Sequence, residues 1–213
     1  MTKRILCYGD SNTWGAIPGG DETTRYTEDI RWTGVLQSVL GNDYRIIEEG
    51  YCGRTTVFDD VVENRVNGLT YFAQCIASQS PLDLIIIMLG TNDLKRKFAV
   101  GPRSSVIALK RYLYALQDIP MAGETPKILI VAPPVIEEDY KNDPMFLEMY
   151  GTDAHAESLK FADEYEAFAK ENNLEFFNAA ACVKASPVDG IHLTPEGHDA
   201  LARALAETVK ALV

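Results

Sequence analysis

Residue types that suit nucleophilic catalysis occur in turn-like segments far apart in the sequence. Ser11 follows Gly9 and Asp10 directly after an apolar run, so it stands on a glycine-containing turn. Asp189 precedes His192 by three residues, a spacing that can bring a carboxylate against an imidazole. A hydroxyl, an imidazole base and a carboxylate that orients the base are the groups that activate a serine nucleophile.

Two further residues can donate hydrogen bonds to a developing negative charge. Gly53 lies in a turn after the second apolar run, where the lack of a side chain lets a backbone N–H approach a bound group closely. Asn92 follows the third run and offers a side-chain amide. Each residue alone is ordinary in a turn, so the combination carries the hypothesis. We expect an oxyanion hole formed by Ser11, Gly53 and Asn92.

The neighbours of these residues are less specific. Asp10 and Asp93 do not recur at a spacing that favours a paired-carboxylate glycosidase, so we interpret them as residues that stabilise turns. Asn12 and Trp14 follow the serine closely, and we expect both to contact substrate. For Trp14 the alternative, a ring that only packs the loop, is equally favoured.

The segments that must position these residues show a regular alternation. Apolar runs rich in β-branched residues predict buried strands over 4–8, 44–49, 83–89, 127–132 and 174–177. Segments of helical periodicity separate them, and Thr194-Pro195 predicts the start of a last helix. This alternation indicates an α/β protein, a three-layer αβα sandwich around a five-stranded parallel sheet.

The predicted sheet brings the candidate residues together. Ligand sites of such sheets lie beyond the carboxyl ends of the strands, where the candidate residues are found. We expect a single domain over residues 1–213, because no linker or repeat divides the chain. Residues 17–29 and 133–155 do not fit the alternation and are predicted to be long loops that shape a site or an interface.

The composition disfavours several classes of partner. The chain has 20 Lys and Arg against 31 Asp and Glu, and its net charge of -11 would repel nucleic acid and anionic membranes. No apolar segment is long enough to span a bilayer, and the N-terminus lacks the apolar stretch of a signal peptide. We expect a cytoplasmic protein that acts on a small molecule.

The cysteines and histidines do not suggest a metal site. Cys7, Cys52, Cys75 and Cys182 are widely scattered and are expected to be reduced thiols, mostly buried. His155 and His198 are expected at the surface, and no histidine pair has a ligand spacing. We expect neither a metal nor a cofactor.

Taken together, the motifs resemble those of the SGNH hydrolases, also called the GDSL family, whose four motif blocks centre on Ser, Gly, Asn and His. The matching residues are Ser11, Gly53, Asn92 and His192. The resemblance covers essentially the whole chain and is closest to the arylesterase and acyltransferase branch. Longer strings support it at 4–11, 31–36, 48–50, 54–56 and 82–93. Asn12 departs from the pattern, because the family usually carries an apolar residue there.

The resemblance implies a flavodoxin-like SGNH hydrolase fold and a serine esterase with a Ser-His-Asp triad. Such an enzyme would hydrolyse short-chain alkyl or aryl esters through an acyl-enzyme, with acyl transfer to alcohols as a second outcome. It also implies a homo-oligomer, an octamer by resemblance, with the two long loops as contacts. One alternative is a carbohydrate esterase that removes acetyl groups from sugars, which the polar Asn12 favours. A non-catalytic αβα ligand-binding module is the alternative from another class.

Overall fold

The structure is a computed structural model that describes residues 2–21, 23–65 and 67–213. Its centre is a five-stranded sheet in the order β2-β1-β3-β4-β5, and all neighbouring strands are parallel. The strands are β1 (Lys3–Gly9), β2 (Tyr44–Gly50), β3 (Leu84–Met88), β4 (Lys127–Ala132) and β5 (Glu175–Asn178). The predicted parallel sheet is confirmed, and each strand matches its apolar run to within about one residue at either end.

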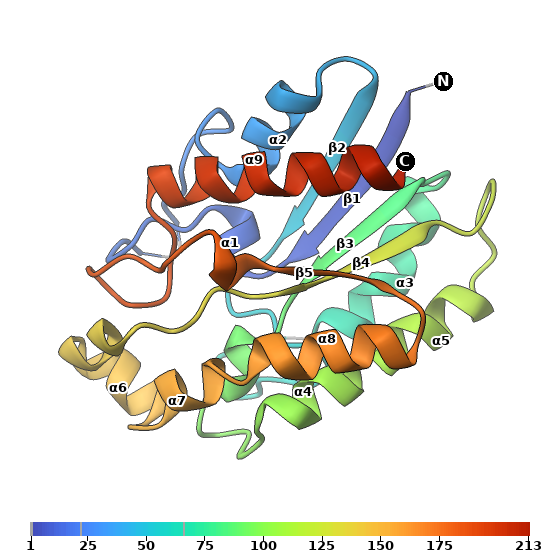
Figure 1. Ribbon diagram of the computed structural model, residues 1–213. Helices are drawn as coiled ribbons and strands as arrows, with labels where there is room; N and C mark the ends of the chain where they lie inside the picture. The colour runs from blue at the N-terminus through green and yellow to red at the C-terminus, as the bar shows by residue number, and fades with distance from the viewer. Residues whose placement is uncertain (1, 22, 66) are drawn as a thin grey trace.

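Helices cover both faces of the sheet (Figure 1). One face is covered by α2 (Trp32–Leu40) and α9 (Pro195–Leu212), which pack against each other. The opposite face is covered by α3 (Gly68–Gln79), α4 (Pro102–Ala108), α5 (Lys110–Asp118) and α8 (Phe161–Glu171). The predicted three-layer αβα architecture is therefore confirmed.

Strand β1 shows how the sequence forms two apolar layers from one sheet. Ile5 and Cys7 belong to the core under α2 and α9, whereas Leu6 and Tyr8 belong to the core on the other side. All four side chains are buried, because successive residues of a strand point to opposite faces and both faces are covered. A continuous apolar run is what such a strand requires.

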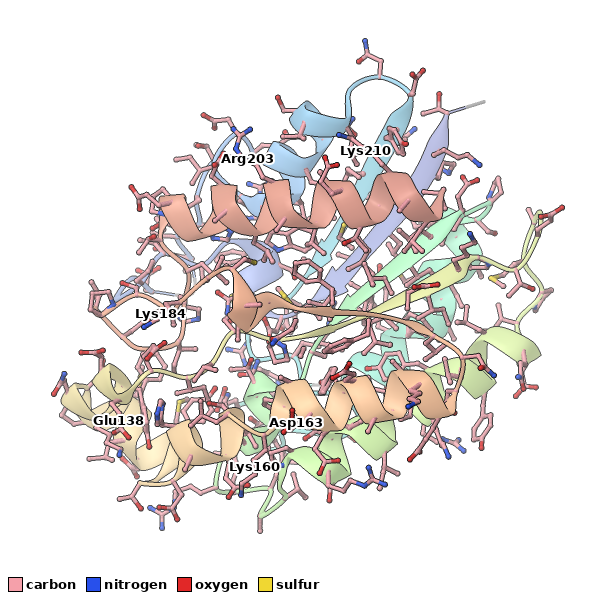
Figure 2. All side chains as sticks on the ribbon, in the orientation of Figure 1. Glu138, Lys160, Asp163, Lys184, Arg203 and Lys210 are labelled. Carbon is pink, nitrogen blue, oxygen red and sulfur yellow. The ribbon has the colours of Figure 1, made fainter. Side chains whose placement is uncertain are left out.

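The outer faces of the covering helices are polar. Figure 2 shows Arg203 and Lys210 pointing away from the sheet on α9, and Asp163 doing so on α8. The buried side of α9 carries Leu201 and Leu205, one helical turn apart. In the described part of the chain, no helix is both long enough and apolar enough to cross a bilayer.

The prediction of an irregular loop over 133–155 is wrong in its second half. This segment contains a 3-10 turn, η2 (Glu138–Asn142), then α6 (Pro144–Tyr150) and the beginning of α7 (Ala154–Ser158). Asp143 caps α6 by accepting a hydrogen bond from the Met145 N–H at 2.8 Å, and Pro144 occupies the first helical position. Asp-Pro is a helix-start signal as well as a turn signal, so tertiary packing decides between them.

The prediction of a surface position for His198 is also wrong. Its side chain is fully buried between α9 and the start of α2, and its Nδ1 accepts a hydrogen bond of 3.2 Å from the Trp32 N–H. That N–H belongs to the first turn of α2, which has no side-chain cap from Arg31. His198 precedes Leu201 by three residues, so it lies on the apolar face of α9. The structure requires a neutral acceptor here.

Burial of His198 predicts a loss of stability in acid. Burial, together with the charge of nearby His192, lowers the pKa of His198 from 6.5 to about 4. The unfolded chain therefore binds this proton first, so the stabilising contribution is complete above about pH 6.5 and is lost as the pH falls toward 4. Urea denaturation should measure a higher free energy of unfolding for the wild type than for His198→Gln at neutral pH. This difference should decrease by about 3 kcal/mol between neutral pH and about pH 4. Parallel curves for the two proteins would contradict this role, and His155→Gln is the matched control.

Candidate active site

Ser11 begins a short helix at the carboxyl end of β1, the second strand in the sheet order. Helix α1 (Ser11–Trp14) follows β1 at once, and Asp10 caps it by accepting a hydrogen bond of 3.0 Å from the Asn12 N–H. The helix lies against the end of β2, where a Cβ on Gly50 would come within 2.1 Å of the Trp14 backbone nitrogen. Only glycine permits this approach, which holds Ser11 rigidly beyond the sheet.

Ser11, His192 and Asp189 form one continuous chain of hydrogen bonds. The Ser11 Oγ lies 3.0 Å from His192 Nε2, and His192 Nδ1 lies 2.7 Å from Asp189 Oδ2. Because the carboxylate accepts, Nδ1 carries the proton and Nε2 faces the serine as an acceptor. The expected approach of Asp189 to His192 is present.

Asp189 is held as an anion by the backbone around it. Its Oδ1 accepts hydrogen bonds of 3.0 Å from the N–H groups of Ile191 and His192, and its Oδ2 accepts one of 3.2 Å from Gly19. Burial raises the pKa of this carboxyl, but the hydrogen bonds and the charge of His192 outweigh burial and leave it below its ordinary value. The group that orients the imidazole therefore stays charged.

Asn12 joins the serine turn to the histidine turn. Its Nδ2 donates to the Ile191 carbonyl at 3.1 Å, and its Oδ1 accepts from the Leu193 N–H at 3.0 Å. The side chain is buried and does not line the cavity beside Ser11. This contradicts the prediction that Asn12 contacts substrate, because both ends of its amide are already bonded to the backbone on either side of His192.

Trp14 also lies outside the cavity lining. Its ring lies under the guanidinium of Arg25, whose carbon is 4.8 Å from the ring centroid, and its carbonyl accepts 2.7 Å from Arg25 Nε. Arg25 also pairs with Glu48 on β2, which Arg31 Nε contacts at 2.8 Å. Of the two alternatives for Trp14, the structure favours the packed loop over substrate contact.

Gly53 and Asn92 lie on two loops that are hydrogen-bonded to each other, and both residues line the same cavity as Ser11. Gly53 has a φ of 74°, a left-handed conformation that favours glycine. Asn92 lies in the 3-10 turn η1 (Thr91–Leu94), and its Nδ2 donates 3.2 Å to the Arg54 carbonyl while its Oδ1 accepts 3.3 Å from the Tyr150 hydroxyl. The amide is fixed in orientation and retains its second N–H as a donor.

Arg54 is a residue whose role the sequence analysis missed. Its buried guanidinium donates to the carbonyls of Gly9, at 2.7 Å, and of Glu49, so it joins the ends of β1 and β2. The guanidinium carbon lies 4.2 Å from the centroid of the Tyr8 ring. Arg54 follows Gly53 directly, which was the available signal, but its burial depends on the tertiary structure.

The two acidic neighbours stabilise the loops, as predicted. Asp10 caps α1, and Asp93 accepts hydrogen bonds from the N–H and hydroxyl of Thr56 at 2.8 and 2.6 Å. Burial raises the pKa of each carboxyl to about 6. Asp93 thereby ties η1 to the loop that contains Gly53.

A cavity of about 470 Å³ opens beside Ser11 and His192. Its apolar wall consists of Ala16, Ile17, Met145, Phe146, Met149, Tyr150 and Ile191. Both long segments, 17–29 and 133–155, contribute to this wall, as expected for segments that shape a site. Glu63 and Lys95 also line the cavity, and the sequence analysis missed them too.

Of the remaining histidine and the cysteines, only Cys52 lines the cavity in the described part of the chain. His155 is half-buried, and its Nδ1 lies 2.7 Å from the Ile136 carbonyl. Cys7, Cys52 and Cys75 are buried, and no disulfide joins cysteines in the described chain. The described residues contain no group of three or more His, Cys, Asp or Glu side chains arranged to hold a metal ion.

Comparisons with known proteins agree with this geometry. The family model of the GDSL-like lipase/acylhydrolase family matches residues 7–200. The aryl esterase of M. smegmatis is 38% identical with a TM-score of 0.93, and a carbohydrate acetylesterase from Sinorhizobium meliloti is 39% identical with a TM-score of 0.93. In both cases the match covers 100% of each chain. None of the curated proteins matches significantly. The chain therefore belongs to the GDSL-like lipase/acylhydrolase family.

Proposed function

We propose that this protein is a serine esterase that hydrolyses short-chain alkyl or aryl esters, with Ser11 as nucleophile, His192 as base and Asp189 as orienting carboxylate. The observation that carries the proposal is the continuous hydrogen-bond chain from Ser11 through His192 to Asp189 at the wall of a cavity. Membership of an acylhydrolase family supports the same class of reaction. The aryl esterase and carbohydrate acetylesterase are similar to this chain over their full length.

The acylation step follows from the positions of these groups. Ser11 Oγ attacks the ester carbonyl carbon while His192 Nε2, 3.0 Å away, takes the hydroxyl proton. Asp189 stabilises the imidazolium that results, without itself becoming protonated. When the tetrahedral intermediate collapses, the bond to the alcohol oxygen breaks and His192 returns the proton to that oxygen. An acyl-Ser11 ester and a free alcohol remain.

Hydrogen-bond donors on three different loops stabilise the negative charge that develops on the carbonyl oxygen in the tetrahedral intermediate. We assign the backbone N–H groups of Ser11 and Gly53 and the Asn92 amide to this role. Asn92 is the strongest support, because contacts with Arg54 and Tyr150 fix its orientation before substrate binds. Such preorganised donors stabilise the transition state more than the ground state.

Water completes the cycle by the reverse sequence. His192 removes a proton from a water molecule, the resulting hydroxide attacks the acyl carbon, and Ser11 Oγ leaves with the proton from His192. A cavity of about 470 Å³ with an apolar wall suits a small ester. Transfer of the acyl group to an alcohol in place of water, which the resemblance implies, stays a prediction.

Covalent labelling distinguishes this esterase from a non-catalytic binding module. A fluorophosphonate probe should label the wild type at Ser11, because an activated hydroxyl attacks phosphorus with loss of fluoride. Ser11→Ala should abolish both labelling, read by mass spectrometry, and hydrolysis of p-nitrophenyl acetate. The control is Ser105→Ala, at a buried serine outside the cavity lining. A wild type that neither labels nor hydrolyses the ester would refute the proposal.

Loss of the Asn92 amide should slow turnover. Asn92→Ala should lower kcat for p-nitrophenyl acetate on the order of 100- to 1,000-fold with little change in KM, because the donor acts on charge that appears in the transition state. Thermal unfolding should show that the variant is folded. Asn67→Ala is the matched control, since Asn67 caps α3 away from the cavity lining. Near-normal kcat for Asn92→Ala would remove this residue from the site.

We also propose self-association through the rim of the cavity. Val61, Val62 and Val188 are 87%, 78% and 62% exposed, and Met145, which lines the cavity, is 55% exposed. Exposed apolar side chains on adjoining segments favour a contact with another protein surface. Sedimentation velocity should find an oligomer for the wild type and a smaller species for Val61→Asp/Val62→Asp. A monomeric wild type at micromolar concentration would exclude the contact.

A further inference from the structure

The cavity has a charged pair in an otherwise largely apolar wall. The ammonium of Lys95 lies 3.0 Å from both carboxylate oxygens of Glu63, and both residues line the cavity. The Lys95 side chain is only 4% exposed and that of Glu63 is 19% exposed. Burying an ion pair costs desolvation energy, and apolar residues of similar size are often as stable or more so. The proposed ester hydrolysis does not use these charges.

Lys95 directly follows η1 and lies close to Asn92. The Lys95 N–H donates to the Asn92 carbonyl at 3.2 Å, and residues three apart in a 3-10 helix are nearly aligned. Both side chains line the cavity. A rise of about 2 Å per residue separates the two positions by about 6 Å along the helix. Asn92 and Lys95 therefore occupy different parts of the cavity wall.

The ammonium retains hydrogen-bonding capacity. Lys95 has three N–H donors; within the described residues its Nζ has hydrogen bonds to Glu63 alone, and the buried Asp60 carboxylate lies 4.0 Å away. Glu63 also contacts Lys97 and Arg65, at 2.5 and 3.2 Å, so its carboxylate is fixed from several sides. A fixed acceptor beside a donor matches a hydroxyl group, which both donates and accepts. A substrate anion would be repelled by Glu63, which makes a neutral polar group the better ligand.

We propose that Lys95 and Glu63 form a subsite that binds a hydroxyl group on the alcohol part of the ester, so that acetate esters of polyhydroxy alcohols, sugars included, are preferred substrates. The inference rests on the proposed esterase function. The hydroxyl belongs to the alcohol part because an acetyl group ends one bond beyond the carbonyl carbon and does not extend to the pair. This subsite takes the role that the sequence analysis gave to Asn12, whose amide is occupied elsewhere.

A pair of nearly isosteric esters tests the subsite directly. In 3-hydroxypropyl acetate a hydroxyl replaces the terminal methyl group of butyl acetate. The ratio of their kcat/KM values in the wild type should exceed the ratio of their uncatalysed hydrolysis rates. Lys95→Met removes the charge and keeps the length of the side chain, and should lower the enzymatic ratio roughly tenfold, as for loss of one hydrogen bond to a charged group.

Lys97→Met is the matched control, because Lys97 contacts the same carboxylate but does not line the cavity. The ratio should stay unchanged in that variant. If circular dichroism shows that Lys95→Met does not fold, Glu63→Gln replaces it. Its ratio of kcat/KM values for the two esters should also fall below the wild-type ratio. A wild-type kcat/KM ratio equal to the ratio of the uncatalysed hydrolysis rates would refute the subsite. An equal decrease of the kcat/KM ratio in Lys95→Met and Lys97→Met would refute it as well. Failure to hydrolyse either ester or phenyl acetate would refute the esterase function instead.

Discussion

The side-chain amide of Asn12 connects two parts of the chain that are almost its whole length apart. It bonds to Ile191 and Leu193, and the residue between them is His192. Ser11 stands immediately before Asn12 on a helix that cannot shift, because Gly50 lets it pack directly on the sheet. The neutral, buried amide of Asn12 therefore fixes the turn that carries His192 relative to Ser11.

Three buried carboxylates near this contact differ in the direction of their pKa shifts. Hydrogen bonds and the neighbouring imidazole keep the pKa of Asp189 below its ordinary value, whereas burial raises the pKa of Asp10 and of Asp93 to about 6. Of these three carboxylates, Asp189 consequently remains ionised to the lowest pH. Burial disfavours the ionised forms of the other two carboxylates. In these buried positions Asp10 caps α1 and Asp93 ties η1 to the loop that contains Thr56.

Two kinds of segment line the cavity: the turns at the edge of the sheet and the segments that cover them. Turns at the strand ends carry Ser11, Gly53 and Asn92, whose proposed roles need fixed positions. The segments around Ile17 and α6 supply most of the apolar wall. Such segments vary more freely than the elements of a scaffold, so they can set substrate size without disturbing the chemistry. The Glu63 and Lys95 pair adds charged groups to the cavity wall.

The αβα architecture and the candidate site residues could be predicted from the amino-acid sequence. Buried runs such as β3 have a local signature, and Ser11, Asn92 and His192 stand in short motifs at predictable ends of elements. Helix α6 was not predicted, because Asp143-Pro144 begins both turns and helices.

Which polar side chains are buried, and which groups they bind, depends on the tertiary structure. Asn12 was expected in the substrate site but bonds to backbone at the far end of the chain, and His198 was expected at the surface but caps α2. Lys95 and Glu63 are 32 residues apart and meet in the cavity wall. Hydrogen bonds between such distant residues depend on how the layers pack, and residue type and local spacing do not encode that packing.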